Sequence, residues 1–151
     1  MIIKWAFWVV IIAVMSNSSF ARMGNFGLGV IIGEPTGISM KYWNGQKTAI
    51  DGAIAWSFEK ESALHLHSDY LIHSFDVIDV SEGALPLYYG IGARLKFQKK
   101  DDKLGIRIPL GIAYYFWKAP LDVFFELVPI LELIPATRFD FNAAIGIRYY
   151  F

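Results

Sequence analysis

Apolar and polar residues alternate most regularly at the end of the chain, over residues 137–151 (TRFDFNAAIGIRYYF). From Phe151 back to Phe139 every second residue is apolar or aromatic, and the residues between them are mostly polar, charged or small. A two-residue period puts these two sets on opposite faces of a β-strand. Strands of soluble sheets usually have about 5–6 residues, whereas a tilted membrane-spanning strand needs about 9–11. The pattern therefore predicts a membrane-spanning strand.

Seven further segments alternate in the same way and are separated by residues typical of turns: 26–33, 36–43, 48–58, 63–75, 85–97, 104–116 and 121–134. Asn44-Gly45, after the second segment, is the strongest signal in the chain for a two-residue hairpin. An even number of antiparallel strands with one continuous apolar face is typical of a small transmembrane β-barrel. Such a sheet must close, because lipid cannot satisfy the backbone groups of an open edge. We therefore predict an all-β fold over residues 22–151, an eight-stranded antiparallel up-and-down transmembrane β-barrel.

The same alternation also fits a soluble, lipocalin-like barrel, with its apolar residues inside and its charged residues outside. Three features favour the membrane barrel: the apolar face is nearly unbroken, the strands are long, and the polar face is rich in glycine and alanine. Aromatic residues also fall at the two ends of the predicted strands, as in the girdles of membrane barrels. The first group is Tyr42, Trp43, Tyr114, Phe116, Trp117, Tyr149 and Phe151, and the second is Trp56, Phe58, Phe97 and Phe139.

Three prolines, Pro86, Pro109 and Pro129, fall inside strand patterns. Proline cannot donate to the hydrogen-bond ladder, and a closed barrel has no edge strand to hold it. Pro129 is in the middle of its strand on the apolar face. We expect a β-bulge there, which would shift the local register.

The first 21 residues have the pattern of a secretory signal peptide. Lys4 is the basic residue, residues 5–15 are apolar, and Ser19 and Ala21 stand at the small-residue positions before the cleavage point. An uncleaved membrane anchor is the alternative, but the apolar stretch is short for a span of about 20 residues. We expect cleavage after Ala21 and a mature barrel of residues 22–151.

Composition excludes several classes of function. The chain has 14 basic and 14 acidic residues, so it lacks the basic excess that nucleic-acid binding requires, and we expect no nucleic-acid partner. It has no cysteine, so neither a disulfide framework nor a thiolate metal site is available.

The leader, the eight alternating segments and the ending Arg148-Tyr149-Tyr150-Phe151 resemble the small eight-stranded outer-membrane barrels of Gram-negative-type bacteria, the OmpA-like class. Residues 33–37 (GEPTG), 41–43 (KYW) and 144–151 (AIGIRYYF) are similar to an uncharacterised family of such barrels. The resemblance implies a place in the bacterial outer membrane, among its lipids and lipopolysaccharide. It also implies that Tyr149 and Phe151 form the signal read by the barrel-assembly machinery. We expect a monomer.

Charged residues on the polar face would point into the barrel lumen: Lys41, Asp51, Asp69, Arg94, Lys96, Arg107, Asp122, Glu126, Glu132, Arg138, Asp140 and Arg148. Both signs are mixed, and buried charges must pair. An eight-stranded barrel has just enough interior for its side chains. These properties favour a plugged barrel with a structural role in envelope integrity. The alternatives are a narrow pore for ions or small solutes, gated by partner exchange in pairs such as Arg107 with Glu126, and a lipid-modifying enzyme.

His65, His67 and His73 share a face with Asp69, and imidazole with carboxylate is a plausible zinc or nickel set. Residues two apart on a strand are about 6–7 Å apart, so all three histidines cannot reach one ion without help from other strands. We therefore interpret them as lumen or rim histidines and expect no metal and no cofactor. Ser68 adjoins His67 but points to the opposite face, so the two cannot act as nucleophile and base. We expect no enzymatic activity.

Replacing Phe151 with alanine should lower the amount of inserted barrel, because the terminal aromatic residue carries the resemblance to the assembly signal. The measurement is the amount of folded, heat-modifiable protein in outer-membrane fractions. Phe139→Ala, an aromatic residue on the same predicted face but away from the terminus, is the control and should insert normally. Normal levels of the Phe151 variant would remove the terminal signal from this interpretation.

Overall fold

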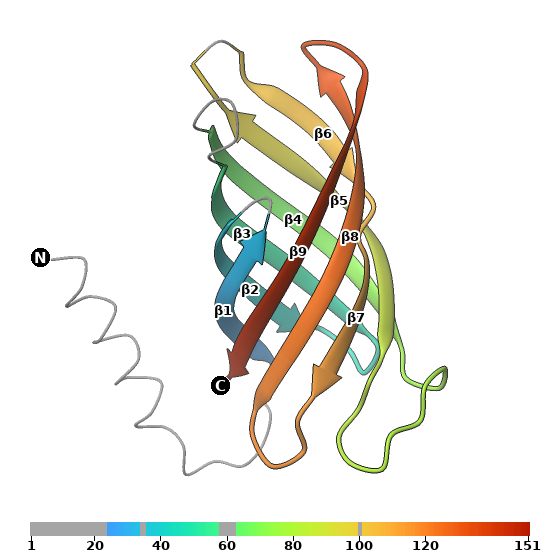
Figure 1. Ribbon diagram of the computed structural model, residues 1–151. Coiled ribbons are helices and arrows are strands. Elements are labelled where there is room, and N and C mark those ends of the chain that lie inside the picture. The colour runs from blue at the N-terminus through green and yellow to red at the C-terminus, as the bar shows by residue number, and fades with distance from the viewer. Residues whose placement is uncertain (1–23, 34–35, 58–62, 100) are drawn as a thin grey trace, which may run out of the picture.

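The computed structural model describes residues 24–33, 36–57, 63–99 and 101–151. The predicted signal peptide lies outside these residues, as do the connections at 34–35 and 58–62. The described residues form nine antiparallel β-strands (Figure 1): β1 (Phe26–Gly33), β2 (Thr36–Trp43), β3 (Thr48–Ser57), β4 (Ala63–Ser74), β5 (Leu87–Phe97), β6 (Lys103–Arg107), β7 (Leu110–Tyr115), β8 (Leu121–Ile134) and β9 (Arg138–Tyr150). No helix in the described part of the chain has the length and hydropathy needed to cross a membrane.

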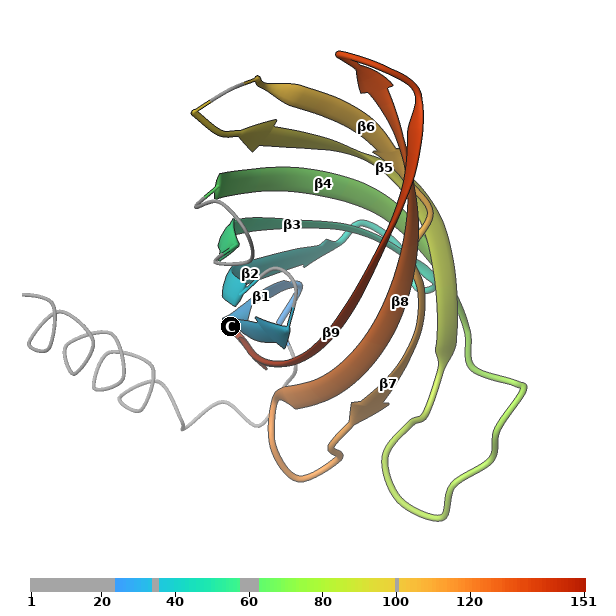
Figure 2. The same cartoon turned by 45° about the horizontal axis from the view of Figure 1, so that its top comes forward.

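The strands follow one another round a ring, which closes where β1 pairs with β9. β6 and β7 occupy one position in this ring, and Figure 1 shows β7 continuing below β6. Both pair with β5 on one side and with β8 on the other. Their pairs with β5, Gly92↔Arg107 and Tyr89↔Leu110, belong to a single register. The predicted eight-stranded, up-and-down antiparallel barrel is therefore confirmed, and Figure 2 shows its strands following the curved wall.

Proline divides the predicted strand 104–116 into β6 and β7 without changing its register. Arg107 pairs with Ile130 of β8, and Leu110 pairs with Leu127, so Ile108 stands opposite Pro129. The Ile108 N–H donates to the Pro129 carbonyl at 3.0 Å, and the missing donor of Pro129 falls at this interruption. The bulge expected at Pro129 is wrong, because β8 keeps one register with β9 through that residue. The register shift of this seam lies between Leu104 and Gly105, near the end of the barrel.

The two faces of the wall differ sharply in chemistry. Apolar side chains point outward: Ile32 is 63% exposed, Ile91 60% and Phe141 59%. The charged residues of the same strands point inward, and Arg107 of β6 is 1% exposed. The lipocalin-like alternative is therefore wrong for this fold, since it requires the opposite arrangement.

Outward aromatic residues lie at both ends of the barrel. Phe116, Trp117 and Phe151 are exposed at the end where β1 begins and β9 finishes, here called the termini end. Trp56 and Phe139 are exposed at the other end, the far end. Trp43 was predicted to join the first group, and that prediction is wrong. Its ring lies inside the barrel, with its centroid 4.3 Å from that of His73, because Trp43 has the inward alternation of Lys41.

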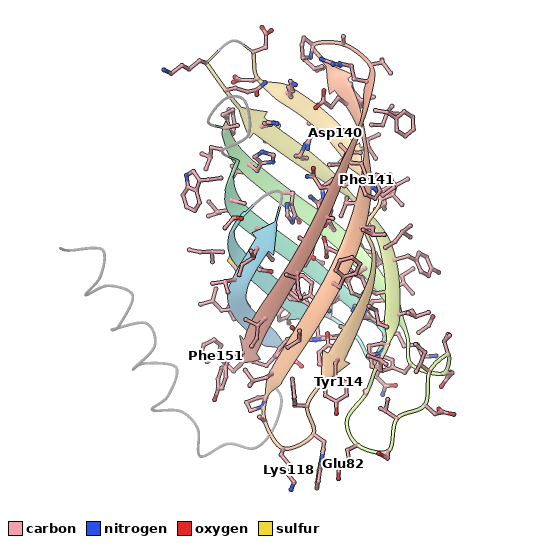
Figure 3. The ribbon with its side chains drawn as sticks, in the orientation of Figure 1. Glu82, Tyr114, Lys118, Asp140, Phe141 and Phe151 are labelled. Atoms are coloured by element: carbon pink, nitrogen blue, oxygen red, sulfur yellow. The ribbon has the colours of Figure 1, made fainter. Side chains whose placement is uncertain are left out.

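The connections at the termini end are tied to the barrel wall. The β2–β3 connection is a hairpin, but Asn44 N–H donates to the Thr48 carbonyl at 3.2 Å, so the loop is 45–47 rather than Asn44-Gly45 alone. In the long β4–β5 connection, the Glu82 carbonyl accepts a hydrogen bond from the Tyr114 hydroxyl at 2.9 Å. The Glu82 carboxylate accepts another from Trp117 at 3.0 Å. Figure 3 shows Glu82 and Tyr114 at this end, together with Lys118.

Glycines on the inward face leave room for large side chains from neighbouring strands. A Cβ atom at Gly111 would overlap the Tyr88 ring, and one at Gly27 would lie 2.7 Å from the Tyr150 ring. Tyr88 and Tyr150 are both almost fully buried. Small and large inward residues are therefore complementary where these strands meet.

The variant Gly111→Ala should destabilise the barrel by about 1–3 kcal/mol, the usual effect of overpacking, because the new methyl group displaces Tyr88. The measurement is the midpoint of urea unfolding in lipid vesicles. Gly52→Ala is the matched control, since Gly52 faces outward and its Cβ would meet only the His67 carbonyl oxygen at 3.2 Å. Equal midpoints for the two variants would contradict the close packing of the lumen.

Candidate functional site

The candidate site is the charged interior of the barrel. The structure buries most of the charged residues that alternation assigns to the lumen: Lys41, Asp51, Asp69, Arg94, Arg107, Asp122, Glu126, Glu132 and Arg148. Lys96 and Asp140 are half-buried. Arg138 is exposed, so it lies at the far rim, and the expectation that it belongs to the lumen network is wrong.

Arg94 organises the network near the far end. Its guanidinium donates to Glu132 of β8 at 2.8 Å and to Asp140 of β9 at 3.3 Å. Lys103 Nζ adds a contact of 3.7 Å to Glu132. Arg94 is on β5, so its side chain connects this strand with β8 and β9, which are not its neighbours in the ring.

Arg107 of β6 connects the charged residues in the middle of the lumen. Its Nε donates to Asp69 of β4 at 2.9 Å, and its Nη2 donates to Glu126 of β8 at 3.3 Å. The Tyr88 hydroxyl donates to the other oxygen of Glu126 at 2.8 Å. Arg107 Nη1 lies 3.1 Å from His67 Nδ1. A planar guanidinium suits this role, because it offers five donors in fixed directions.

Arg148 of β9 holds the network toward the termini end. Its Nε donates to the Ser39 hydroxyl at 2.9 Å, and its two terminal nitrogens lie 3.6 Å from Asp51 and 3.5 Å from Asp122. The guanidinium carbon lies 3.9 Å from the centroid of the Phe124 ring. Three other strands, β2, β3 and β8, therefore contact this one buried cation.

Lys41 is buried against neutral acceptors and aromatic rings. Its Nζ donates to His73 Nε2 and to the Tyr115 hydroxyl, both at 2.7 Å. The Trp43 ring centroid lies 4.5 Å from Nζ. His73 Nδ1 lies 3.1 Å from the Lys47 carbonyl, which can only accept, so Nδ1 carries the proton and Nε2 accepts from the ammonium. This cluster packs inside the barrel at the termini end.

Sequence reasoning missed Tyr88 and Trp43 as parts of this interior and gave no role to Tyr115 or Tyr150. The Tyr150 hydroxyl donates to Asp122, and Tyr115 contacts Lys41. The available signal was their alternation. Each of these aromatic residues is an even number of positions from a charged inward residue of the same predicted strand. Their partners lie on other strands, so the pattern along one strand could not supply them.

The histidines all point inward, but the structure does not bring them together on one ligand position. His73 lies with Lys41, and neither ring nitrogen of His65 has a hydrogen-bond partner in the described part of the chain. Asp51, His67 and Asp69 each offer one donor atom, and these atoms lie within 4.8 Å of one another. Ser68 is exposed on the outward face and donates to the Asp51 carbonyl at 3.1 Å, so it is not paired with His67.

Comparison with known proteins adds a family and a fold. The family described as "Protein of unknown function (DUF3996)" matches residues 17–151. No curated protein matches the sequence. A similar solved structure is the N-terminal β-barrel domain of OprF from Pseudomonas aeruginosa, with a TM-score of 0.60 and 12% identity over 86% of this chain and 100% of that chain. At this identity the likeness shows a shared barrel fold.

The variant Arg148→Met should lower the free energy of unfolding by about 3–5 kcal/mol, because it leaves Asp51 and Asp122 buried without their partner. The control is Arg138→Met at the exposed rim, which should change stability by no more than about 0.5 kcal/mol. Urea unfolding in vesicles measures both. A loss for Arg148→Met no greater than that for Arg138→Met would show that the central ion pairs do not stabilise the barrel.

Proposed function

The chain belongs to the DUF3996 family, whose function is not established, and from its closed barrel and filled lumen we propose a structural role in the bacterial outer membrane. In this proposal it is an integral β-barrel that contributes to envelope integrity, and its polar interior acts as a plug rather than a passage.

The outward face supports the membrane part of the proposal. Exposed apolar residues occur on every side of the ring, for example Ile38 of β2, Tyr70 of β4, Ile108 beside β6 and Ile145 of β9. Soluble proteins rarely expose a continuous apolar surface of this kind. Aromatic residues at both ends and a sheet without a free edge are what a lipid environment requires.

The main support for a plug is that buried charges pair across the lumen at successive levels along the barrel axis. Arg94, Arg107 and Arg148 each contact two carboxylates on other strands, and each is at most 2% exposed. An ion crossing the barrel would have to separate these pairs. Separating a buried pair leaves an uncompensated charge, which costs several kcal/mol.

The remaining parts of the proposal rest on the resemblance of the leader and of the chain's ending. We expect export by a cleaved signal peptide, recognition of Tyr149 and Phe151 by the barrel-assembly machinery, and outer-membrane lipid and lipopolysaccharide around a monomer. We assign no catalytic step.

Single-channel recording in a planar bilayer tests the plug. The refolded mature protein should be silent, whereas Arg107→Ala/Glu126→Ala should conduct, because the double variant removes both members of a central pair and leaves space at the middle of the lumen. Changing both residues together keeps the net charge of the lumen unchanged, and Asp69 is then the one carboxylate that loses an arginine contact. Arg138→Ala, which alters only the exposed rim, should stay silent.

Heat-modifiable migration on gels shows whether each sample is folded before recording. Steady openings of the unmodified protein that change with Arg107→Ala would overturn the plug and establish the alternative, a narrow pore gated by these charges. Silence of the double variant as well would show that the Arg107–Glu126 pair is not what blocks the lumen.

A further inference from the structure

Two carboxylates face each other inside the barrel wall. Asp51 of β3 and Asp69 of β4 are direct partners in the antiparallel register, and both point into the lumen. They are 3% and 2% exposed. Like charges placed directly opposite on neighbouring strands are destabilising, and burial makes the repulsion stronger. A third group must therefore compensate them.

The arginines compensate only one oxygen of each carboxylate. Asp69 Oδ1 accepts from Arg107 Nε at 2.9 Å, and Asp51 Oδ2 lies 3.6 Å from a terminal nitrogen of Arg148. The other two oxygens, Asp51 Oδ1 and Asp69 Oδ2, are buried and have no hydrogen-bond partner among the described residues. Buried polar atoms are rarely left in this state, so two unpartnered oxygens on facing carboxylates indicate a ligand position.

His67 supplies a third donor at the same place. It precedes Asp69 by two residues on β4, so both side chains point inward, and its Nε2 lies 3.9 Å from the unpartnered Asp69 Oδ2. One donor atom from each of Asp51, His67 and Asp69 falls within 4.8 Å of the others. Ligand atoms around a cation such as Zn²⁺, at bond lengths of about 2.0–2.2 Å, lie closer together than this, so small side-chain movements would complete the set.

The positive and negative charges of the interior are closely balanced. The described residues that are buried include five carboxylates, Asp51, Asp69, Asp122, Glu126 and Glu132, against four permanently or normally charged bases, Lys41, Arg94, Arg107 and Arg148. The half-buried residues near the far end add one carboxylate, Asp140, and two bases, Lys96 and Lys103. With them the charges of the interior balance, so the support for a cation is the pair of facing carboxylates with their unpartnered oxygens.

We propose that Asp51, Asp69 and His67 bind one divalent cation of the Zn²⁺ class inside the barrel. Two carboxylate oxygens and one imidazole nitrogen are a ligand set that Zn²⁺ accepts. The cation joins β3 to β4 and removes the repulsion between their carboxylates. This inference does not depend on whether the lumen is a plug or a pore.

Binding requires a defined rearrangement of Arg107. Its Nη1 now lies 3.1 Å from His67 Nδ1. When Nε2 binds the metal, the neutral imidazole carries its proton on Nδ1 and no longer accepts there. Nη1 must then turn away, while the contact of Arg107 with Glu126 at 3.3 Å keeps the guanidinium in place.

The test is metal retention by the full mature protein. Because the position is enclosed, the protein is refolded with ZnCl₂ present, separated from free metal by gel filtration, and analysed for zinc by mass spectrometry. We expect one Zn²⁺ per folded chain. Refolding with CoCl₂ instead should give the strong visible absorption of four- or five-coordinate Co²⁺, which distinguishes an ion bound in a site from the weakly absorbing hydrated ion.

The variants Asp51→Asn, Asp69→Asn and His67→Gln should lower Zn²⁺ affinity by about tenfold or more. His65→Gln is the matched control, because His65 is inward on the same strand, two residues from His67, and should leave affinity within about twofold. Gel mobility identifies folded samples, and His67→Gln decides the test if the aspartate variants do not fold. Absence of retained metal, or equal retention by His67→Gln and His65→Gln, would overturn the proposal. Zinc-free protein that is stabilised by Asp51→Asn would identify a shared proton as the compensating group.

Discussion

The seam between β1 and β9 is the constraint on which the rest of this structure depends. Seven consecutive pairs, from Gly27↔Tyr150 to Gly33↔Ala144, join the two ends of the described sheet. Closure satisfies the backbone groups that an open edge would expose, which a lipid environment demands. It also divides the side chains into two sets by simple alternation, one around the ring and one enclosed by it. Whatever is polar on these strands must then find partners inside.

The enclosed set is held together by arginines that reach across strands. A guanidinium can satisfy two carboxylates at once, and Arg94, Arg107 and Arg148 each do so at a different level. Lys41 has a different environment of neutral acceptors and aromatic faces, and it lies next to Trp43 near the termini end. Glycine on the inward face is the other half of this arrangement, since Tyr88 occupies the space above Gly111. The paired charged side chains and the packed aromatic side chains therefore share the interior of the barrel.

The facing aspartates are the exception within this order. The arginine contacts in the middle of the lumen leave Asp51 Oδ1 and Asp69 Oδ2 without a hydrogen-bond partner among the residues that the structure describes. In a network that served only to neutralise buried charge, we would expect a basic side chain between these two carboxylates. They distinguish the two proposals for the interior, a blocked path along the axis and a local cation site, because either proposal can hold without the other.

The sequence by itself determined the fold class, the limits of most strands to within two residues, and the face on which most residues lie, with Trp43 as an exception. It did so because a two-residue period is a local property of the chain. It also placed Arg107 and Glu126 on neighbouring strands with the correct parity.

Only the tertiary structure decided which residues of neighbouring strands lie at the same level along the barrel axis. Register arises from pairing between strands and from the turns that join them, which alternation does not encode. For this reason the sequence could not show that Asp51 faces Asp69, that Arg138 lies at the rim, or that Pro129 stands opposite Ile108 without a bulge. The contacts of Tyr88 and Trp43 also depend on the closed ring, because their partners come from distant strands.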